Sequence, residues 1–136
     1  MSVLVDTPIW SLALRRKRRH LSQPDQKLVE EWAELVRAGQ AQIIGPIRQE
    51  ILSGIRRTAD LNELREVLSS FEDIPLSTGD YEQAAIFFNQ CRAKGITGTP
   101  IDLQICAIAH RLGFKIFTTD ADFVRYARHI PIQIYL

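Results

Sequence analysis

Two aspartates follow short apolar runs that are typical of β-strands. Asp6 comes directly after residues 3–5, and Asp120 comes after residues 116–119. In a parallel sheet the carboxyl ends of the strands meet at one edge, which is where such sheets bind ligands. Each aspartate also has a structural interpretation, because Asp is a favoured N-cap of the helix that follows. The spacing therefore predicts acids at one sheet edge and leaves capping open as the alternative.

Glu50 is a third acid in an unusual position. It lies in a helix that begins at Gly45-Pro46 and carries isoleucines at every fourth position from 47 to 55. This period predicts Glu50 on the buried stripe, beside Gly54. A carboxylate there needs a partner, because burying a lone charge costs several kcal/mol. The partner would be a cation at the sheet edge or, in the structural alternative, an arginine.

Asp102 and Asp122 stand in the first turns of two later helices. Asp102 is the third residue of a helix that begins at Thr99-Pro100 and is apolar on nearly every side, which indicates a central, buried helix. Asp122 comes two residues after Asp120. Both have structural alternatives, because the spacing from Thr99 to Asp102 resembles a capping box and acids are favoured at helix N-termini.

Acids gathered at one sheet edge repel one another unless a cation lies between them. Carboxylates suit hard divalent cations, and Mg²⁺ binds through a few of them while it keeps several waters. A zinc site is not indicated, because the three histidines are scattered and Cys91 and Cys106 lie in apolar helical stretches, where a free cysteine packs as a small hydrophobe. The glycine motifs of dinucleotide, P-loop and serine-hydrolase sites are absent. The pattern predicts Mg²⁺, with Mn²⁺ as the alternative ion.

One basic segment interrupts an otherwise acidic chain. The sequence has 17 Lys and Arg against 16 Asp and Glu. Five of the cations form a single run, and without it 12 basic residues face 16 acidic ones, a net charge of −4. Such a run is either a solvated loop or a contact for phosphates or an acidic partner, because clustered cations release counterions from nucleic acid. The run consists of Arg15, Arg16, Lys17, Arg18 and Arg19.

The elements that position these side chains alternate along the chain. Apolar periodicity and turn signals predict strands over residues 3–5, 42–44, 74–76, 115–117 and 132–134. They predict helices that begin at Thr7-Pro8 and Gly45-Pro46 or that cover residues 24–38, 60–70, 77–94, 99–112 and 121–128. This alternation indicates an α/β fold with a mainly parallel sheet of about five short strands and helices on both faces. With 136 residues and no linker or repeat, we expect one domain over residues 1–136.

The ordered set of motifs resembles the PIN-domain nucleases. The matching features are Asp6 at the end of the first strand, residues 49–54 around Glu50, Asp102 at the start of a buried helix, and residues 118–123. The short chain and its opening on Asp6 and Thr7 are similar to the VapC-type toxins of toxin–antitoxin pairs. The resemblance covers essentially the whole chain. Pro8 departs from the Asn or Ser that the family often has at this position, and it suits a helix start.

The resemblance implies a metal-dependent endoribonuclease that hydrolyses phosphodiester bonds in single-stranded regions of RNA. It implies a cognate antitoxin that neutralises the protein, and a homodimer. By the resemblance, the catalytic residues are Asp6, Glu50, Asp102 and Asp120. The ligands of Mg²⁺ or Mn²⁺ are Asp6, Asp102, Asp120 and Asp122. Glu50 would bind a second metal or position the attacking water. The basic run would contact RNA or the antitoxin.

Two other interpretations remain at this point. A phosphoacceptor receiver domain is also α/β, but it needs paired acids after the first strand and a lysine near the end of the last, whereas Asp6 stands alone and residues 133–136 contain no lysine. A catalytically silent PIN-like module would bind RNA or a partner without cutting. The N-terminus lacks the pattern of a secretory signal, and no apolar run approaches the roughly 18 residues that span a bilayer. We therefore expect a cytoplasmic protein without membrane contact.

Overall fold

Four parallel strands form the sheet of the computed structural model, which describes residues 1–16 and 18–136. The strand order is β3-β2-β1-β4, and the register pairs Leu4 with Gln42 on one side and with Ile116 on the other. Every residue of β1 is buried, as expected of a parallel strand that helices cover on both faces. The strands are β1 (Val3–Val5), β2 (Ala41–Ile44), β3 (Asp73–Ile74) and β4 (Lys115–Phe117).

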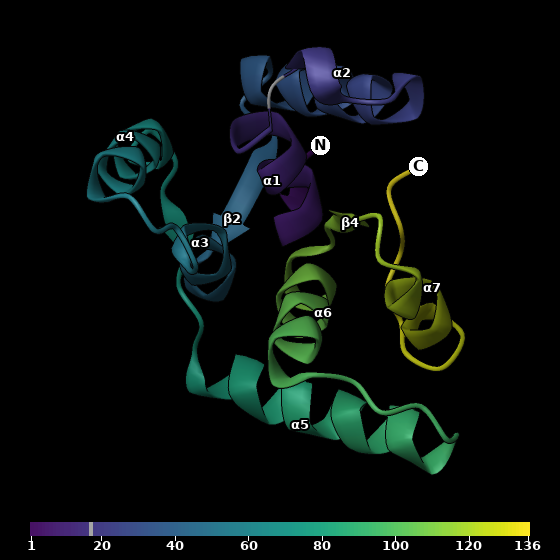
Figure 1. The fold of residues 1–136 in the computed structure, drawn as a ribbon. Helices are drawn as coiled ribbons and strands as arrows, with labels where there is room; N and C mark the ends of the chain where they lie inside the picture. Colours follow the sequence, from purple (N-terminus) through teal and green to yellow (C-terminus); the bar gives the residue numbers. More distant parts are fainter. Residues whose placement is uncertain (17) are drawn as a thin grey trace.

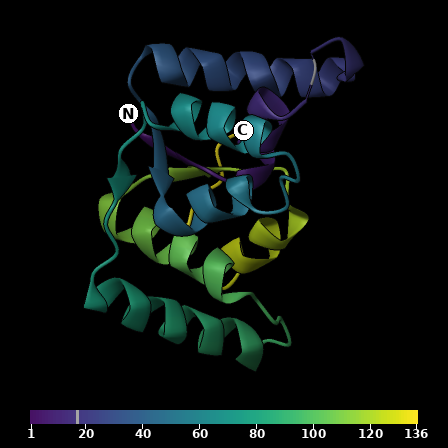
Figure 2. The same ribbon diagram turned by 60° about the vertical axis from the view of Figure 1, so that its left-hand side comes forward.

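Helices cover both faces of this sheet. The chain places β1, β2 and β3 in one direction and then crosses to β4 at the opposite edge, so right-handed connections put the last crossover on the other face. Accordingly α2 and α4 lie on one side of the strands and α5 and α6 on the other (Figures 1 and 2). The helices are α1 (Thr7–Leu14), α2 (Gln23–Arg37), α3 (Gly45–Leu52), α4 (Thr58–Leu68), α5 (Thr78–Ala93), α6 (Pro100–Leu112) and α7 (Ala121–Ala127).

Trp10 fixes α1 over the sheet. Its side chain is fully buried, and its indole Nε1 donates a hydrogen bond of 2.9 Å to the carbonyl oxygen of Val5. Its ring makes edge-on contacts with Trp32 of α2 and with Phe71, with centroids 5.6 and 4.9 Å apart. Edge-on aromatic pairs add stability beyond their buried area. The start of α1, where Asp6 is the N-cap, is therefore held firmly at the end of β1.

The most buried helix is α6, which confirms the interpretation of its apolar sequence. Residues 105–109 are at most 1% exposed, and Cys106 among them is a free thiol, as is Cys91 of α5. The Thr99 side chain caps the first turn, and Gly113 ends the helix in the left-handed region with a φ of +70°. This fixed helix determines where Asp102 lies. Within the described part of the chain, no helix has both the length and the apolar character needed to cross a membrane.

The prediction of a fifth strand over residues 132–134 was wrong. Only Ile134 pairs, in a single parallel bridge with Ile116 beside β4. The preceding chain turns back on itself, because the backbone N–H of Ile132 donates to the carbonyl oxygen of Ile130. Pro131 between them has no N–H to contribute to a ladder. The sheet therefore has four strands, and the C-terminal segment only touches its edge.

Candidate active site

The carboxyl ends of β1 and β4 bring two acidic segments side by side. Val5 and Phe117 are partners in the register, and the backbone N–H of Asp6 donates to the carbonyl oxygen of Phe117 over 2.9 Å. Thr118 then links the two segments. Its hydroxyl donates to Asp6 Oδ2 at 2.7 Å and accepts a hydrogen bond of 3.0 Å from the backbone N–H of Asp120. Parallel pairing thus places Asp6 next to the loop that leads into α7.

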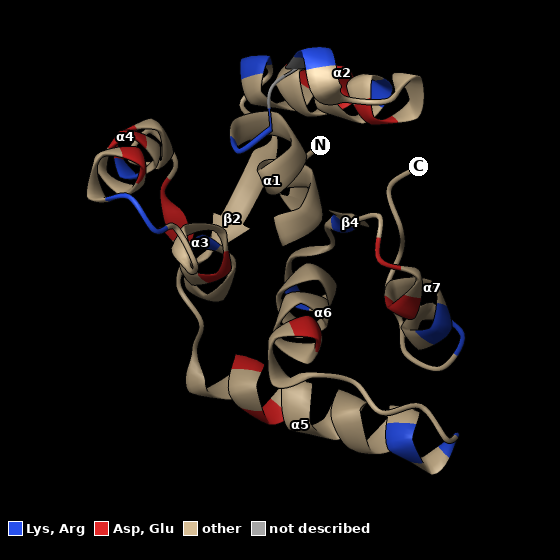
Figure 3. Ribbon diagram, viewed as in Figure 1, with Lys and Arg blue, Asp and Glu red and all other residues tan. Residues whose placement is uncertain are grey.

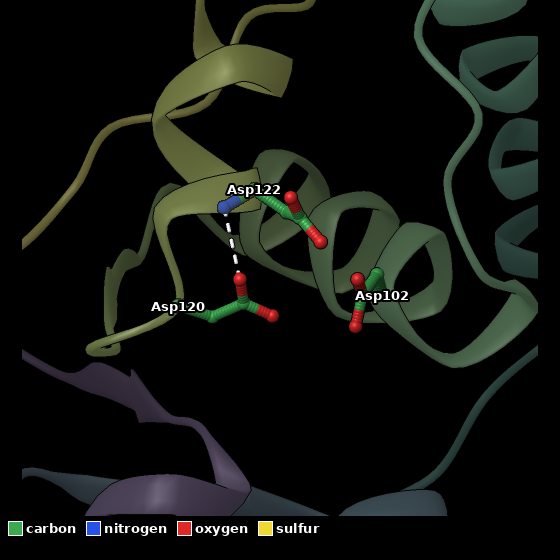
Figure 4. Close-up of side chains that lie close together, drawn as sticks. All are labelled: Asp102, Asp120 and Asp122. Carbon is green, nitrogen blue, oxygen red and sulfur yellow. Dashed lines mark hydrogen bonds between the residues drawn. The ribbon is translucent and has the colours of Figure 1, made fainter.

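Three aspartates from two helices form a cluster. Asp102, Asp120 and Asp122 each offer one carboxylate oxygen, and these oxygens all lie within 4.8 Å of one another (Figure 4). Asp102 lies in the first turn of α6, while Asp120 is the N-cap of α7 and accepts from the backbone N–H of Asp122 at 2.9 Å. Both helices therefore present their N-terminal ends, which favour negative charge, to the cluster.

Asp6 lies behind this cluster with only 4% of its surface exposed. It also acts as an N-cap, because its Oδ1 accepts a hydrogen bond of 2.8 Å from the backbone N–H of Thr7. Burial raises the pKa of Asp6 to about 6, against the lowering effect of hydrogen bonds from Thr118 and Thr7, and the charges of Asp102 and Glu50 raise it too. The buried carboxylate is thus destabilised at neutral pH, which a nearby cation would relieve.

Tyr126 of α7 holds Asp102 in place. Its hydroxyl donates a hydrogen bond of 2.8 Å to Asp102 Oδ2, and the tyrosine itself is 1% exposed. Burial raises the pKa of Asp102, and the charges of Asp120 and Asp122 contribute in the same direction, while the Tyr126 hydrogen bond lowers it. Gly98 packs closely beside this pair, because a Cβ at that position would lie 2.2 Å from Leu103 Cδ2 and 3.3 Å from the tyrosine hydroxyl.

Glu50 lies at the rim of the site, which corrects the expectation that it is buried. The helix α3 ends at Leu52, and Gly54 has a φ of +83°, so the apolar stripe stops before residue 55. Ile47 and Ile51 take the buried face, and Glu50 is exposed. The partner of its Oε1 is a threonine rather than an arginine: the hydroxyl of Thr7, next in sequence to Asp6, donates to it over 2.9 Å.

The predicted site residues therefore differ in how close they lie to the cluster. Asp102, Asp120 and Asp122 form one cluster, Asp6 is joined to it through Thr118, and Glu50 borders it from α3. The donors are carboxylate oxygens, which suit Mg²⁺ and Mn²⁺ and not the nitrogen and sulfur chemistry of structural zinc. The residues present fit a hard divalent cation.

Two hydroxyls that organise these acids, those of Tyr126 and Thr118, were not predicted from the sequence. Tyr126 follows Asp122 by four residues, so both share one face of α7, and this spacing was the available signal. Thr118 precedes Asp120 by two residues and belongs to a segment already matched to the family. Nothing in the spacing showed that either hydroxyl would reach a carboxylate.

The basic run lies at the opposite end of α1 from Asp6. Figure 3 shows acidic segments of α3, α6 and α7 around one end of this helix and basic residues where the chain passes from its other end to α2. Eight helical residues separate the two ends by about 12 Å. Arg15, Arg16 and Arg19 are exposed, Arg18 begins a short 3₁₀ turn, and Lys17 lies outside the described residues.

Comparisons with known proteins agree on one fold. A family model of the PIN domain matches residues 3–129. The structure of FitAcB from Neisseria gonorrhoeae superposes with a TM-score of 0.74 at 16% identity, covering 98% of this chain and 96% of that one. The structure of VapBC2 from Rickettsia felis, bound to a DNA fragment from its promoter, superposes with a TM-score of 0.75 at 16% identity. The match covers 99% of this chain and 98% of that one.

A toxin–antitoxin complex from Klebsiella pneumoniae is also similar, with a TM-score of 0.68 at 21% identity over 90% of each chain. At these identities the structural likeness shows the fold alone. A search among curated protein sequences found no match.

Proposed function

The chain belongs to the PIN domain family, and from this premise we propose that it is a Mg²⁺-dependent endoribonuclease, the toxin of a toxin–antitoxin pair. Because the chain belongs to this family, the alternative of a receiver domain is excluded. The observation that carries the proposal is the cluster of Asp102, Asp120 and Asp122, whose carboxylate oxygens lie within 4.8 Å of one another at the carboxyl edge of the sheet. Such an edge is the ligand-binding edge of open parallel α/β sheets.

Asp102, Asp120 and Asp122, with Asp6 behind them, would hold Mg²⁺ or Mn²⁺. When bound, the cation supplies positive charge to the scissile phosphate and lowers the pKa of a water. Asp122 also forms an ion pair with Arg125, three residues further along α7. Glu50 has one oxygen held by Thr7 and stands exposed at the rim, so we assign it the task of orienting the attacking water.

Tyr126 gives a test of this ligand set that does not depend on cleavage. Tyr126→Phe keeps the buried ring and removes only the hydroxyl that fixes Asp102. Groups that orient a metal ligand typically change metal affinity by 10- to 100-fold, so we expect Mn²⁺ to bind about tenfold more weakly in calorimetric titrations. Tyr81→Phe on the exposed surface of α5 is the matched control and is expected to leave the affinity unchanged. Equal Mn²⁺ affinity in both variants would contradict the role given to Tyr126.

The proposed substrate is single-stranded RNA, with the basic run as part of its binding surface. Replacing Arg15, Arg16, Arg18 and Arg19 with Gln should weaken RNA binding and flatten its salt dependence, by about 0.7 in logarithmic slope for each lost phosphate contact. Fluorescence anisotropy at a series of salt concentrations measures the slope. Arg92→Gln, on α5, is the control. A salt slope identical to that of the unmodified protein would show that the run is only a solvated loop without RNA contact.

We further propose a cognate antitoxin as the protein partner and a homodimer as the assembly. The antitoxin proposal is supported by similar structures described as a toxin–antitoxin complex and as VapBC2. The homodimer proposal extends the family resemblance and predicts a mass in light scattering of twice the 15.5 kDa of the chain. Because the proposed substrate is cellular RNA, the proposed place of action is the cytoplasm.

The experiment that tests this function is cleavage of a fluorophore-labelled single-stranded RNA. We expect cleavage with Mg²⁺ or Mn²⁺, loss of cleavage in EDTA, and recovery when Mg²⁺ is added in excess. Asp102→Asn, purified in parallel, reports contaminating nuclease. RNA binding without cleavage at any metal concentration would contradict the proposal and favour a catalytically silent PIN-like module.

A further inference from the structure

An open surface pocket of about 320 Å³ lies beside the acidic site and takes no part in holding the proposed cation. Two of its lining residues adjoin the acids in sequence: Pro8 comes two residues after Asp6, and Thr119 directly precedes Asp120. We call it the flank pocket. It lies between α1, the start of α2 and the loop before α7, and is lined by Pro8, Ser11, Leu12, Arg16, Asp25 and Thr119.

The polar groups of the flank pocket are not engaged with other side chains. Across residues 1–16 and 19–136, the Ser11 hydroxyl, the Arg16 guanidinium and the Asp25 carboxylate make no side-chain hydrogen bond or ion pair. Asp25 takes part in the cap of α2 only through its backbone N–H, which donates to Ser22 Oγ at 3.2 Å. A cation and an anion that face one cavity without pairing are both available to a ligand.

The flank pocket combines an apolar wall with polar side chains. Pro8 and Leu12 form the wall, and four polar residues complete the lining: Ser11 of α1, Asp25 of α2, and Arg16 and Thr119 from the segments that follow α1 and precede α7. Sites for small ligands orient the ligand with a few placed polar groups, in volumes from about 300 Å³ upward.

We propose that the flank pocket holds the nucleotide next to the scissile phosphate and selects guanine there. The proposal rests on the proposed ribonuclease function. Arg16 would pair with a backbone phosphate, which a guanidinium binds through two parallel hydrogen bonds. Pro8 and Leu12 would contact the base and sugar, and the Ser11 hydroxyl can bond the 2′-hydroxyl that distinguishes RNA.

The preference for guanine follows from the chemistry of Asp25. An ionised carboxylate accepts hydrogen bonds and donates none. Guanine presents two adjacent donors, N1–H and N2–H, on its Watson–Crick edge. Adenine and cytosine place a ring-nitrogen acceptor beside the amino group, and uracil flanks its single donor with two carbonyl oxygens, so each opposes the carboxylate with lone pairs. Single-stranded bases are read on this edge.

The same geometry divides the basic run between two surfaces. Arg16 lines the flank pocket, whereas its neighbour Arg15 lines a separate groove of about 590 Å³ that includes Leu64 and Val67 of α4. We therefore assign the contact with the nucleotide in the flank pocket to Arg16, and not to Arg15.

The first test measures binding of mononucleotides in EDTA, so it needs neither metal nor cleavage. We expect 5′-GMP to bind at least tenfold more tightly than AMP, CMP or UMP, in line with the discrimination that a good two-bond base contact gives. In NMR titrations, GMP should shift the amide signals of Ser11, Asp25 and Thr119. Asp25→Asn should lose the preference, because an amide offers one donor and one acceptor edge. Glu82→Gln, an equal charge change on exposed α5, should retain it.

The second test sequences the cut ends of a randomised single-stranded RNA pool treated with Mg²⁺. We expect guanine enriched at one fixed position next to the cut, and the enrichment reduced about tenfold by Asp25→Asn but not by Glu82→Gln. Arg16→Gln should lower cleavage of all sequences alike, because a phosphate contact carries no base information.

The outcomes separate the inference from the function on which it rests. Equal affinity for the four mononucleotides, or GMP-induced shifts away from the flank pocket, would overturn the guanine site even if the protein cleaves RNA. A guanine preference that persists in a folded Asp25→Asn variant would also overturn it. Selective GMP binding at the flank pocket without metal-dependent cleavage would keep the nucleotide site and overturn the proposed function.

Discussion

Asp102→Asn is expected to lower the rate of RNA cleavage by about a hundred- to a thousandfold while the protein stays folded. The substitution keeps the shape of the side chain, and its Oδ1 can still accept the hydrogen bond that Tyr126 donates to the carboxylate. It removes one of three negative charges whose oxygens lie within 4.8 Å of one another. Loss of a charge that positions the cation removes stabilisation of the transition state, which single groups supply at about 10²- to 10³-fold each.

The measurement is initial cleavage rate at saturating Mg²⁺, with thermal melting to confirm the fold. Asp60→Asn, an exposed residue in the first turn of α4, is the matched control and should cleave at the unmodified rate. Because burial and the charges of Asp120 and Asp122 raise the pKa of Asp102, the Asn variant should be at least as stable as the original protein in EDTA. Full activity in a preparation free of other nucleases would exclude Asp102 from the catalytic set.

Asp6→Asn is expected to stabilise the metal-free protein at neutral pH by up to about 3 kcal/mol. Burial raises the pKa of Asp6 from 3.8 to about 6 in the fold. Well below pH 3.8 the carboxyl is protonated in both the folded and the unfolded state, so it does not change the free energy of unfolding. As pH rises toward 6 the unfolded chain ionises first, so the fold loses stability, and above pH 6 the full penalty of about two pKa units remains. An asparagine never carries that charge.

The measurement is a melting temperature in EDTA at pH 4 and at pH 7.5. We expect the variant to gain about 10 °C over the original protein at pH 7.5 and little at pH 4. Asp60→Asn, which changes an exposed carboxylate, should show no such pH-dependent gain. If the variant is less stable than the original protein by the same margin at both pH values, Asp6 is an ordinary helix cap.

The parts of the fold that follow from local sequence were predictable. The β-branched run before Asp6 is β1, and the apolar helix that begins at Pro100 is the buried α6. The helix predicted over residues 77–94 is α5, which begins at Thr78 after the Ser77 side chain accepts a hydrogen bond from the backbone N–H of Asp80. In each case the signal and the structure lie within a few residues of each other, so no tertiary information was needed.

The parts that depend on distant contacts were not predictable. Residues 132–134 have the composition of a strand, yet the turn around Pro131 limits their pairing to one bridge. The apolar spacing through residue 55 suggested a buried Glu50, but Gly54 ends the periodicity early. Asp80 illustrates a further limit: its two carboxylate oxygens also accept hydrogen bonds from Arg111, 31 residues away on α6, at 2.7 and 3.0 Å. The spacing of residues in one chain does not encode such pairings.

The proposed function requires that the cluster of Asp102, Asp120 and Asp122 holds the divalent cation. Anomalous diffraction from crystals soaked in Mn²⁺ tests it most directly, because manganese scatters anomalously and its position can be read without assumptions about activity. We expect a manganese peak at coordination distance, about 2 Å, from carboxylate oxygens of this cluster, and its loss in Asp102→Asn crystals soaked in the same way. Crystals that show no peak at the cluster, or a peak that persists unchanged in the variant, would exclude the cluster as the cation site.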